Sequence, residues 1–421
     1  MKLTFHGGFS EIGRSCIQVA TKQTNLLLDA GTKLTPDGAE YPLLRNYEEI
    51  DAIAISHAHL DHCGALPFFY HQGFSGQIFC TRMTKSLAKI LLRDSYKVER
   101  LEQVRPLYAE DDVFHALDAM AFVDFRKSFS YNDVNITFFD SGHIPGGSSI
   151  LIEADGKRLL YTGDINTEDT NLMHGADSDY GPIDIMICET TYGNCDHPKR
   201  MEEELDFLRD VKHALSEGGS VLVASLAVSR AQEMLLILGK EKFSVPLYLD
   251  GMAKKVLTRL LDQSKILRNP DALHAIAKRV RFVHGQKMRD DIIRSPAIFV
   301  APSGMLDGGP AMEYLKTFWH DEKVLIALTC YQGEGTNGRL LLEEGDVYID
   351  GTKRHVQGKA KKYDFSSHIG MTPLHNYITH VNPKLLLLNH GDHTALEALA
   401  TWAKKEKIDV RVPKVGDELV V

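Results

Sequence analysis

The sequence predicts an α/β protein in which a sandwich-like domain is interrupted by a second α/β domain built on a parallel sheet. Short β-rich segments bounded by turn residues dominate the first part of the chain, 1–195. Strands and helices then alternate regularly over 196–350, which is typical of parallel sheets with crossover helices. The strand and loop pattern of the first part returns over 351–421, so we expect the chain to re-enter the first domain there.

The first part is expected to supply the strands of the sandwich. These strands cover 2–7, 15–20, 24–31, 52–59, 77–81, 134–140, 148–154, 158–164 and 183–190. Several of them end at an acidic or histidine residue, and open sheets place their ligand sites at the carboxyl ends of strands. Between them, the apolar residues of 83–98 recur at spacings of three and four, which predicts a helix.

The middle part is expected to build the parallel sheet. Strands are predicted over 220–225, 246–251, 297–304 and 324–331, and helices over 202–219, 229–241 and 252–263. Strands and helices that alternate at this spacing form βαβ units, so a second domain should begin near 196.

Composition narrows the class of protein. The 421 residues, 43% of them hydrophobic, can fill one large or two medium cores, because single cores stop growing near about 250 to 300 residues. The formal net charge of -9, from 48 Lys and Arg against 57 Asp and Glu, disfavours a protein that coats a polyanion with its whole surface. A locally positive groove is compatible with this charge.

The apolar runs, the N-terminal residues and the cysteines together predict a cytoplasmic protein that does not enter a membrane. The longest apolar runs, at 221–228 and 385–388, fall far short of the roughly 20 residues that span a bilayer. The N-terminal residues turn to His, Gly and Ser before an apolar stretch can form, so no secretory signal is expected. The six cysteines show no paired spacing, which favours reduced and mostly buried thiols.

Three histidines and one aspartate lie close together at the end of the strand expected at 52–59. They are His57, His59, Asp61 and His62. Imidazole nitrogens and carboxylate oxygens are ligands that zinc prefers. Their spacing does not put all four on one face of a helix, so we expect a loop that enters a helix and divides the ligands between two adjacent ions.

This cluster resembles the HxHxDH motif of the metallo-β-lactamase superfamily, and other elements of that superfamily follow in the same order. Asp29 ends the strand NLLLD, His143 lies in DSGHIPGG and Asp164 in LLYTGD. The resemblance implies an αββα sandwich that holds two Zn²⁺ ions, with Mn²⁺ or Mg²⁺ as alternatives. It further implies that His57, His59 and His143 hold one ion, that Asp61, His62 and a later histidine hold the other, and that Asp164 bridges them.

The inserted domain narrows the resemblance to the β-CASP nucleases. Glu189 in ICETTYG, His368 in DFSSHIG and His390 in LLLNHGD match motifs A, B and C of that family. The resemblance implies that His390 completes the second ion's ligands, and that His368, Asp61 and Glu189 act in catalysis. His368 lies among serines and glycine, and an imidazole near its ordinary pKa can donate a proton to a leaving oxygen.

Further strings resemble RNA-processing members of the family, the archaeal RNase J and cleavage and polyadenylation factor nucleases. They are EIGRSC at 11–16, SLAVSRAQE at 225–233, APSGMLDGGP at 301–310 and YQGEGTNGR at 331–339. The expected substrate is single-stranded RNA, and the residues expected to bind it are Ser225, Arg230, Ser303, Ser366, Ser367 and His368. Ser225 and Ser303 lie at the ends of expected strands, where a hydroxyl can meet a phosphate; an ordinary helix-capping serine is the alternative.

A basic run precedes His368. Its members are Lys353, Arg354, His355, Lys359, Lys361 and Lys362, and no acidic residue interrupts it. We expect either contacts with the RNA backbone or a solvated basic loop.

The sequence leaves several functions open. The expected activity is that of a 5′-to-3′ exoribonuclease of the RNase J type that prefers 5′-monophosphate RNA, because a separate RNA-reading module is not evident. An endoribonuclease of the cleavage and polyadenylation factor type is the alternative, followed by a non-catalytic RNA-processing scaffold and a small-molecule thioester hydrolase. A homodimer is expected, although only one helix and one strand are predicted after His390; RNA-processing or exosome-associated partners stay open.

Overall fold

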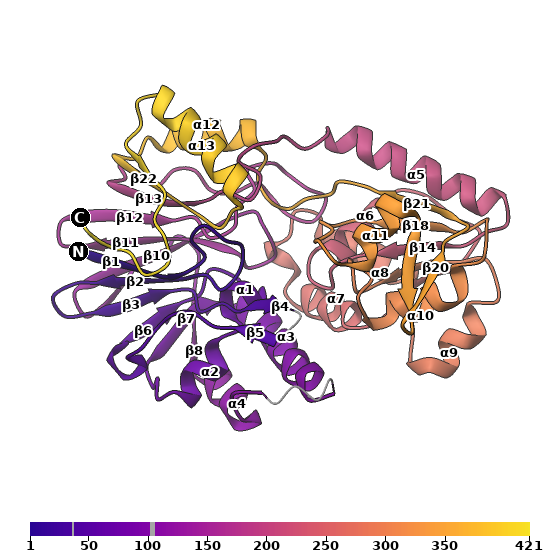
Figure 1. Ribbon diagram of the computed structural model, residues 1–421, viewed down its shortest axis with the longest axis horizontal. Helices are drawn as coiled ribbons and strands as arrows, with labels where there is room; N and C mark the ends of the chain where they lie inside the picture. The colour runs from indigo at the N-terminus through magenta and orange to yellow at the C-terminus, as the bar shows by residue number, and fades with distance from the viewer. Residues whose placement is uncertain (36–37, 102–105) are drawn as a thin grey trace. The chain divides into compact units, whose positions relative to one another are not determined.

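Contacts within the chain divide it into two units in the computed structural model, which describes residues 1–35, 38–101 and 106–421. The first unit comprises Met1–Asp169, His174–Asp196 and Ser367–Val421, and the second comprises Thr170–Met173 and His197–Ser366. Figure 1 shows the elements of both units. The chain therefore returns to the first unit after Ser366, and the return expected at 351 lies earlier than this boundary.

Two seven-stranded sheets form the centre of the first unit. The order in one sheet is β24 (Glu418–Val420), β1 (Lys2–Gly7), β2 (Cys16–Ala20), β3 (Asn25–Leu28), β6 (Ala52–Ala54), β7 (Gln77–Thr81) and β8 (Met120–Val123). The order in the other is β23 (Val410–Arg411), β22 (Leu385–Asn389), β13 (Ile185–Glu189), β12 (Lys157–Tyr161), β11 (Ser148–Ala154), β10 (Val134–Asp140) and β9 (Phe129–Tyr131). Strands β3, β6, β7 and β8 run parallel to one another, as do β12, β13, β22 and β23.

Alternating side chains explain why the two sheets stack. Phe5 of β1 and Ile152 of β11 lie in one buried cluster that draws on both sheets. Leu151, the neighbour of Ile152, packs instead with Leu374 and Leu399 in a second cluster beneath two helices. One sheet is thus covered by α12 (Met371–Val381) and α13 (His393–Lys405), while α1 (Leu60–Cys63), α2 (Leu66–His71), α3 (Arg82–Leu101) and α4 (Glu110–Asp118) lie beside the other (Figure 1). The predicted αββα sandwich is confirmed.

The second unit contains the predicted parallel sheet. Its order is β16 (Val280–Phe282), β15 (Leu247–Leu249), β17 (Ile298–Ala301), β14 (Val221–Ala224), β18 (Leu325–Leu328) and β21 (Lys359–Lys362), all parallel. Its helices are α5 (Arg200–Ser216), α6 (Arg230–Gly239), α7 (Ala253–Asp262), α8 (Pro270–Ala277), α9 (Gly285–Ile292), α10 (Gly309–Phe318) and α11 (Asn337–Glu344). Strand β21 is not among the expected strands, because its Lys-rich sequence carries no apolar pattern. It lies at the edge of the sheet, where lysines are common.

The remaining elements are short. They are the antiparallel strand pairs β4 (Lys33–Thr35) with β5 (Gly38–Glu40) and β19 (Asp346–Ile349) with β20 (Thr352–His355), and the 3₁₀ turns η1 (Tyr47–Glu49) and η2 (Ser264–Ile266). Within the described ranges, every helix is too short or too polar to cross a lipid bilayer.

Candidate metal centre

Strand ends from both sheets of the first unit carry the predicted ligands. These ends carry His57 and His59 after β6, His143 after β10, Asp164 after β12, Glu189 at the end of β13 and His390 after β22. Strands β12, β13 and β22 are parallel neighbours, so their carboxyl ends lie at one edge of their sheet. Asp61 and His62 belong to the short helix α1, which His59 directly precedes. The loop that enters a helix is therefore present as predicted.

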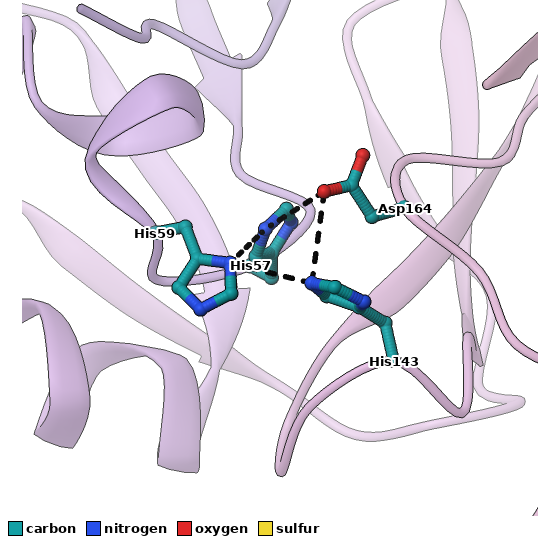
Figure 2. A group of neighbouring side chains, drawn as sticks. All are labelled: His57, His59, His143 and Asp164. Carbon is teal, nitrogen blue, oxygen red and sulfur yellow. Dashed lines mark hydrogen bonds and ion pairs between the residues drawn. The ribbon is translucent and has the colours of Figure 1, made fainter. Parts of the chain in front are cut away.

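Three imidazoles and one carboxylate converge in the first donor group, which consists of His57, His59, His143 and Asp164 (Figure 2). Nδ1 of His59 lies 3.2 Å from Nε2 of His57 and 3.3 Å from Nε2 of His143. Oδ2 of Asp164 lies 3.5 Å from Nε2 of His57 and 3.6 Å from Nε2 of His143. Four ligands placed tetrahedrally at about 2.0 to 2.2 Å from zinc are separated by roughly 3.3 to 3.6 Å, so these atoms fit one zinc ion.

Hydrogen bonds on the far side of two rings set their tautomers. Nδ1 of His143 lies 3.0 Å from the carbonyl oxygen of Ser367, so Nδ1 carries the proton and Nε2 keeps its lone pair. Nδ1 of His57 lies 3.0 Å from Oγ of Ser56. This is the arrangement that orients metal-ligating histidines, because the lone pair of the other nitrogen is then directed at the ion.

The second donor group consists of Asp61, His62, Asp164 and His390. Oδ1 of Asp164 lies 3.3 Å from Nε2 of His62 and 3.4 Å from Nδ1 of His390. Oδ2 of Asp61 lies 3.2 Å from Nε2 of His390 and 3.8 Å from Nε2 of His62. Asp164 therefore offers one carboxylate oxygen to each group.

Two buried atoms of this second group lack a hydrogen bond. Nε2 of His62 and Oδ1 of Asp164 are shielded from solvent, and although they face each other at 3.3 Å, neither makes a well-aligned hydrogen bond within the residues that the structure describes. A buried polar atom without a partner costs about 1 to 3 kcal/mol, and such atoms call for an explanation such as an ion. The donor set and its unmet polar atoms thus fit a bound metal.

Asp29 supports the second group from behind. Its Oδ2 lies 2.7 Å from Nδ1 of His62 and accepts hydrogen bonds from Tyr161 and Ser56, each at 2.7 Å. Its Oδ1 accepts a hydrogen bond from the Ser56 amide at 2.6 Å. Ser56 and Tyr161 were not predicted. Only the position of Ser56 next to His57 hinted at a role, because Tyr161 fits the pattern of an ordinary buried strand residue.

Burial and charge act in opposite directions on the imidazoles. Burial lowers the pKa of His57 and His143 well below the ordinary value, and it lowers the pKa of His59 to about 4. These three rings are neutral at pH 7, the state in which imidazole binds a metal. Burial also lowers the pKa of His62 and His390, but nearby carboxylates, led by Asp164, outweigh it and raise both pKa values. The second group therefore attracts positive charge.

Glu189 and His368 form a pair beside Asp164. Nδ1 of His368 lies 2.9 Å from Oε2 and 3.2 Å from Oε1 of Glu189, and 4.0 Å from Oδ2 of Asp164. Burial lowers the pKa of His368, but the charges of Glu189 and Asp164 outweigh it and raise that pKa to about 9. Thr191, which was not predicted, donates a hydrogen bond of 2.5 Å to Oε2 of Glu189. His368 is thus held by a carboxylate next to both donor groups.

The predicted RNA-binding residues of the second unit lie at the carboxyl edge of its sheet. Ser225 follows β14 and is fully buried, and its hydroxyl has no hydrogen-bond partner within the described part of the chain. Arg230 begins α6 and is 6% exposed, and burial lowers its pKa to about 10. Ser303 follows β17, and its hydroxyl accepts a hydrogen bond from the Asp307 amide at 3.4 Å. Gly304 lies close to Ser225. A Cβ atom added at Gly304 would be 3.1 Å from the carbonyl carbon of Ser225.

The two serines before His368 fall on either side of the boundary between the units. Ser366 belongs to the second unit, where its amide donates to Asp364 at 3.0 Å. Ser367 belongs to the first unit, is buried and supplies the carbonyl that orients His143.

Carboxylates neutralise most of the basic run. Ion pairs join Lys353 to Glu344 and Asp346, His355 to Asp346, Lys359 to Asp210 and Lys361 to Asp206 and Asp210. The guanidinium of Arg354 lies over the ring of Trp319. These contacts favour a structural role for the run over the expected contacts with an RNA backbone.

Three family models match successive parts of the chain. A Metallo-beta-lactamase superfamily domain matches residues 18–188, a Beta-Casp domain matches 231–341, and a Zn-dependent metallo-hydrolase RNA specificity domain matches 353–413. The sandwich and its converging donor groups define the class of protein, a metallo-hydrolase of the metallo-β-lactamase fold. Within that class, the chain belongs to the β-CASP family.

Relatives match the chain over nearly its whole length. The Probable RNase MJ4 of Methanocaldococcus jannaschii is 39% identical over 427 residues, which cover 100% of both proteins. The RNase J-like protein of the same organism is 35% identical and is covered to 99%. Endoribonuclease ysh1 of Schizosaccharomyces pombe is 29% identical over 96% of this chain and 56% of its own length.

A solved structure supports the fold. The crystal structure of a protein of unknown function from Enterococcus faecalis V583 has a TM-score of 0.64 and 15% sequence identity. It covers 100% of this chain and 99% of that one, so the similarity extends over the entire fold.

Proposed function

We propose that this chain hydrolyses RNA phosphodiesters at a centre of two zinc ions, with Mn²⁺ or Mg²⁺ as alternative metals. The observation that carries the proposal is the position of Asp164, whose two oxygens face two separate sets of histidines. Such an arrangement suits two adjacent ions that share a ligand. The match to an RNA specificity domain and the relatives named as RNases support RNA as the substrate.

In this proposal each donor group holds one ion. His57, His59 and His143 would hold the first, Asp61, His62 and His390 the second, and Asp164 both. Two ions bound there would activate a water molecule at neutral pH and polarise the phosphoryl oxygens.

His368 is the proposed donor of a proton to the leaving oxygen. Because Nδ1 faces both carboxylate oxygens of Glu189, Nδ1 keeps its proton and Nε2 is the atom that can deliver one. Glu189 thereby orients the ring, and Asp61 completes the proposed catalytic set from the second donor group. A general acid of this kind contributes typically about 10²- to 10⁴-fold in rate.

The proposed reaction proceeds from the 5′ end and prefers 5′-monophosphate RNA. Ser225 carries a buried hydroxyl with unused hydrogen-bonding capacity in the turn before α6, and Arg230 begins that helix. A helix N-terminus with a hydroxyl and a guanidinium suits a phosphate group. Ser303, Ser366 and Ser367 complete the proposed substrate-binding set.

Digestion of RNA labelled at its 5′ end tests this proposal. Matched RNAs with 5′-monophosphate, triphosphate or hydroxyl ends should be compared at equal concentration. Immediate release of labelled mononucleotide, fastest from the monophosphate, is the expected result. Uncut RNA in the presence of each of the three metals would refute the proposed activity.

An endoribonuclease is the second candidate, favoured by the similarity to Endoribonuclease ysh1. The same digestion separates the two candidates. Internal labelled fragments that appear before any mononucleotide would support internal cleavage and overturn the 5′-to-3′ direction.

The proposal includes a cytoplasmic homodimer. The cysteines are free thiols, and most of them are buried, which suits a reducing compartment. The homodimer is inferred from the resemblance to RNase J. Sedimentation equilibrium should give twice the chain mass of 47.1 kDa, and a single-chain mass at micromolar concentration would refute it.

A further inference from the structure

The segment 8–15 between β1 and β2 forms a closed loop. Its ends lie so near each other that a Cβ at Gly7 would collide with the carbonyl oxygen of Arg14. Ser10 and Arg14 have positive φ angles of 56° and 42°, a region that residues other than glycine rarely occupy. Backbone conformations of this kind persist where surrounding contacts hold them.

The backbone of this loop reaches two residues of the second donor group. The amide of Ser15 donates to the carbonyl oxygen of Asp61 at 2.9 Å, and the amide of His390 donates to the carbonyl oxygen of Gly8 at 2.7 Å. Asp61 and His390 are 329 positions apart in the chain, yet their side chains lie 3.2 Å apart. One loop therefore fixes the main chain at both of these residues.

A cluster of charges holds the loop from inside. The Glu11 carboxylate accepts from Nε of Arg14 at 2.7 Å, from Nζ of Lys33 at 3.2 Å and from the Gly8 amide at 3.4 Å. The side chains of Glu11 and Arg14 are only 13% and 17% exposed, so solvent screens their interaction less than it screens a surface ion pair. Glu11 thus connects both ends of the loop.

The first donor group is oriented by other residues. His57 contacts Ser56 through Nδ1, and His143 contacts the Ser367 carbonyl through Nδ1. A change at Glu11 should therefore act on the second group and leave the first group intact.

From these contacts we infer that Glu11 is a positioning residue for the second ion. Together with Arg14 and Lys33, it holds the loop so that Gly8 and Ser15 fix the main chain of His390 and Asp61. The inference rests on the proposed two-ion centre, whose ligands it does not alter. Mutation of residues that support metal ligands without contacting the ion typically weakens metal binding by about 10- to 100-fold.

Zinc titration of the whole, metal-free chain tests the inference. The wild type, Glu11→Gln and the control Glu153→Gln should be titrated against a chromophoric zinc chelator. Glu153 forms an ion pair of 2.9 Å with Arg158 in the same unit. Glu153→Gln therefore removes one paired negative charge, as Glu11→Gln does. For Glu11→Gln we expect affinity for the second ion to fall at least about tenfold, with the first ion changed less than about twofold.

The unfolding temperature of each metal-free protein shows whether a variant still folds. Lys33→Met removes one partner of Glu11, a lysine whose side chain is 37% exposed. This variant should weaken binding of the second ion less than Glu11→Gln does. Unchanged affinity for the second ion, or equal weakening of both ions in a folded variant, would overturn the role of Glu11. A wild type that binds fewer than two ions would overturn the two-ion centre and this inference together.

Discussion

The carboxylate of Asp29 lies 2.7 Å from Nδ1 of His62 and so determines which nitrogen of that ring faces Asp164. Nε2 of His62 is left 3.3 Å from Oδ1 of Asp164, without a hydrogen bond in the described residues. A carboxylate behind a ligating histidine fixes the tautomer and raises the basicity of the ligand. Asp29 should therefore strengthen the second ion's binding without contacting it.

Asp29→Asn tests this role. An amide has nearly the shape of the carboxylate but no charge, so we expect about 10- to 100-fold weaker binding of the second zinc ion and a smaller effect on the first. Zinc titration measures both steps. Asp51→Asn is a matched control, because Asp51 accepts a hydrogen bond from the Asn25 amide rather than from a predicted ligand. If Asp29→Asn and Asp51→Asn bound the second zinc ion with equal affinity, the supporting role of Asp29 would be contradicted.

His368 and His390 should respond differently to substitution. His390 faces Asp61 and Asp164, whereas His368 faces Glu189. We expect His390→Ala to lose bound zinc and RNA cleavage together. We expect His368→Gln to keep its zinc while kcat falls by about 10²- to 10⁴-fold, since a proton donor has been removed.

Metal content and single-turnover RNA cleavage, measured on the same preparations, distinguish these two roles. Loss of zinc from His368→Gln comparable to that from His390→Ala would show that His368 is a ligand and would refute its role as proton donor.

Ser225→Ala should change the choice of RNA end. The ratio of the cleavage rates of 5′-monophosphate and 5′-hydroxyl RNA should fall by about 10-fold or more, because a hydrogen bond to a charged group contributes roughly 1.5 to 3 kcal/mol. Ser220→Ala is the control, since Ser220 is a buried serine just before β14 whose hydroxyl accepts from the Ala297 amide. An unchanged ratio would remove Ser225 from the phosphate site.

Asp210 forms ion pairs with Lys359 and Lys361 of the basic run, which makes the run a poor candidate for RNA binding. Burial raises the pKa of Asp210, but hydrogen bonds from Lys359, Tyr363 and Lys361 outweigh it and set that pKa at about 2. The folded pKa lies below the unfolded value of about 3.9, so the stabilisation is complete above about pH 4 and is lost as the pH falls toward about 2. Because Lys359 is half exposed, screening reduces the effect to about 1 kcal/mol.

Denaturant unfolding of the wild type and Asp210→Asn measures this contribution. The variant should be less stable by about 1 kcal/mol at pH 7, and the difference should shrink as the pH falls from about 4 toward about 2. A difference that stays constant over this range would show that the charge of Asp210 does not stabilise the second unit.

Predictability depended on how far apart the interacting residues lie in the chain. His57, His59, Asp61 and His62 could be predicted because they are neighbours in sequence and have the spacing of metal ligands. The distant His390 required a resemblance to known proteins, since nothing local distinguishes it from a core histidine. The fold class followed from strand and helix patterns that repeat locally.

Other features could not be predicted because they depend on tertiary contacts. Tyr161 binds Asp29 across 132 positions, from the opposite sheet, and no local pattern marks it. The second unit is expected to end at 350 because the strand and loop pattern of the first part returns after that position. In the structure, β21 joins the sheet through main-chain pairing with β18, while Asp206 and Asp210 form ion pairs with Lys359 and Lys361.

Asp164 belongs to both donor groups, so zinc content and RNA cleavage in Asp164→Ala test the proposed two-ion centre most directly. Wild type and variant should be freed of metal, reloaded with zinc, dialysed and assayed on the same RNA. We predict two zinc ions per chain and cleavage for the wild type, and less than one ion and no cleavage for the variant. Cleavage by metal-free wild type, or two ions retained by Asp164→Ala, would contradict the proposed two-ion centre.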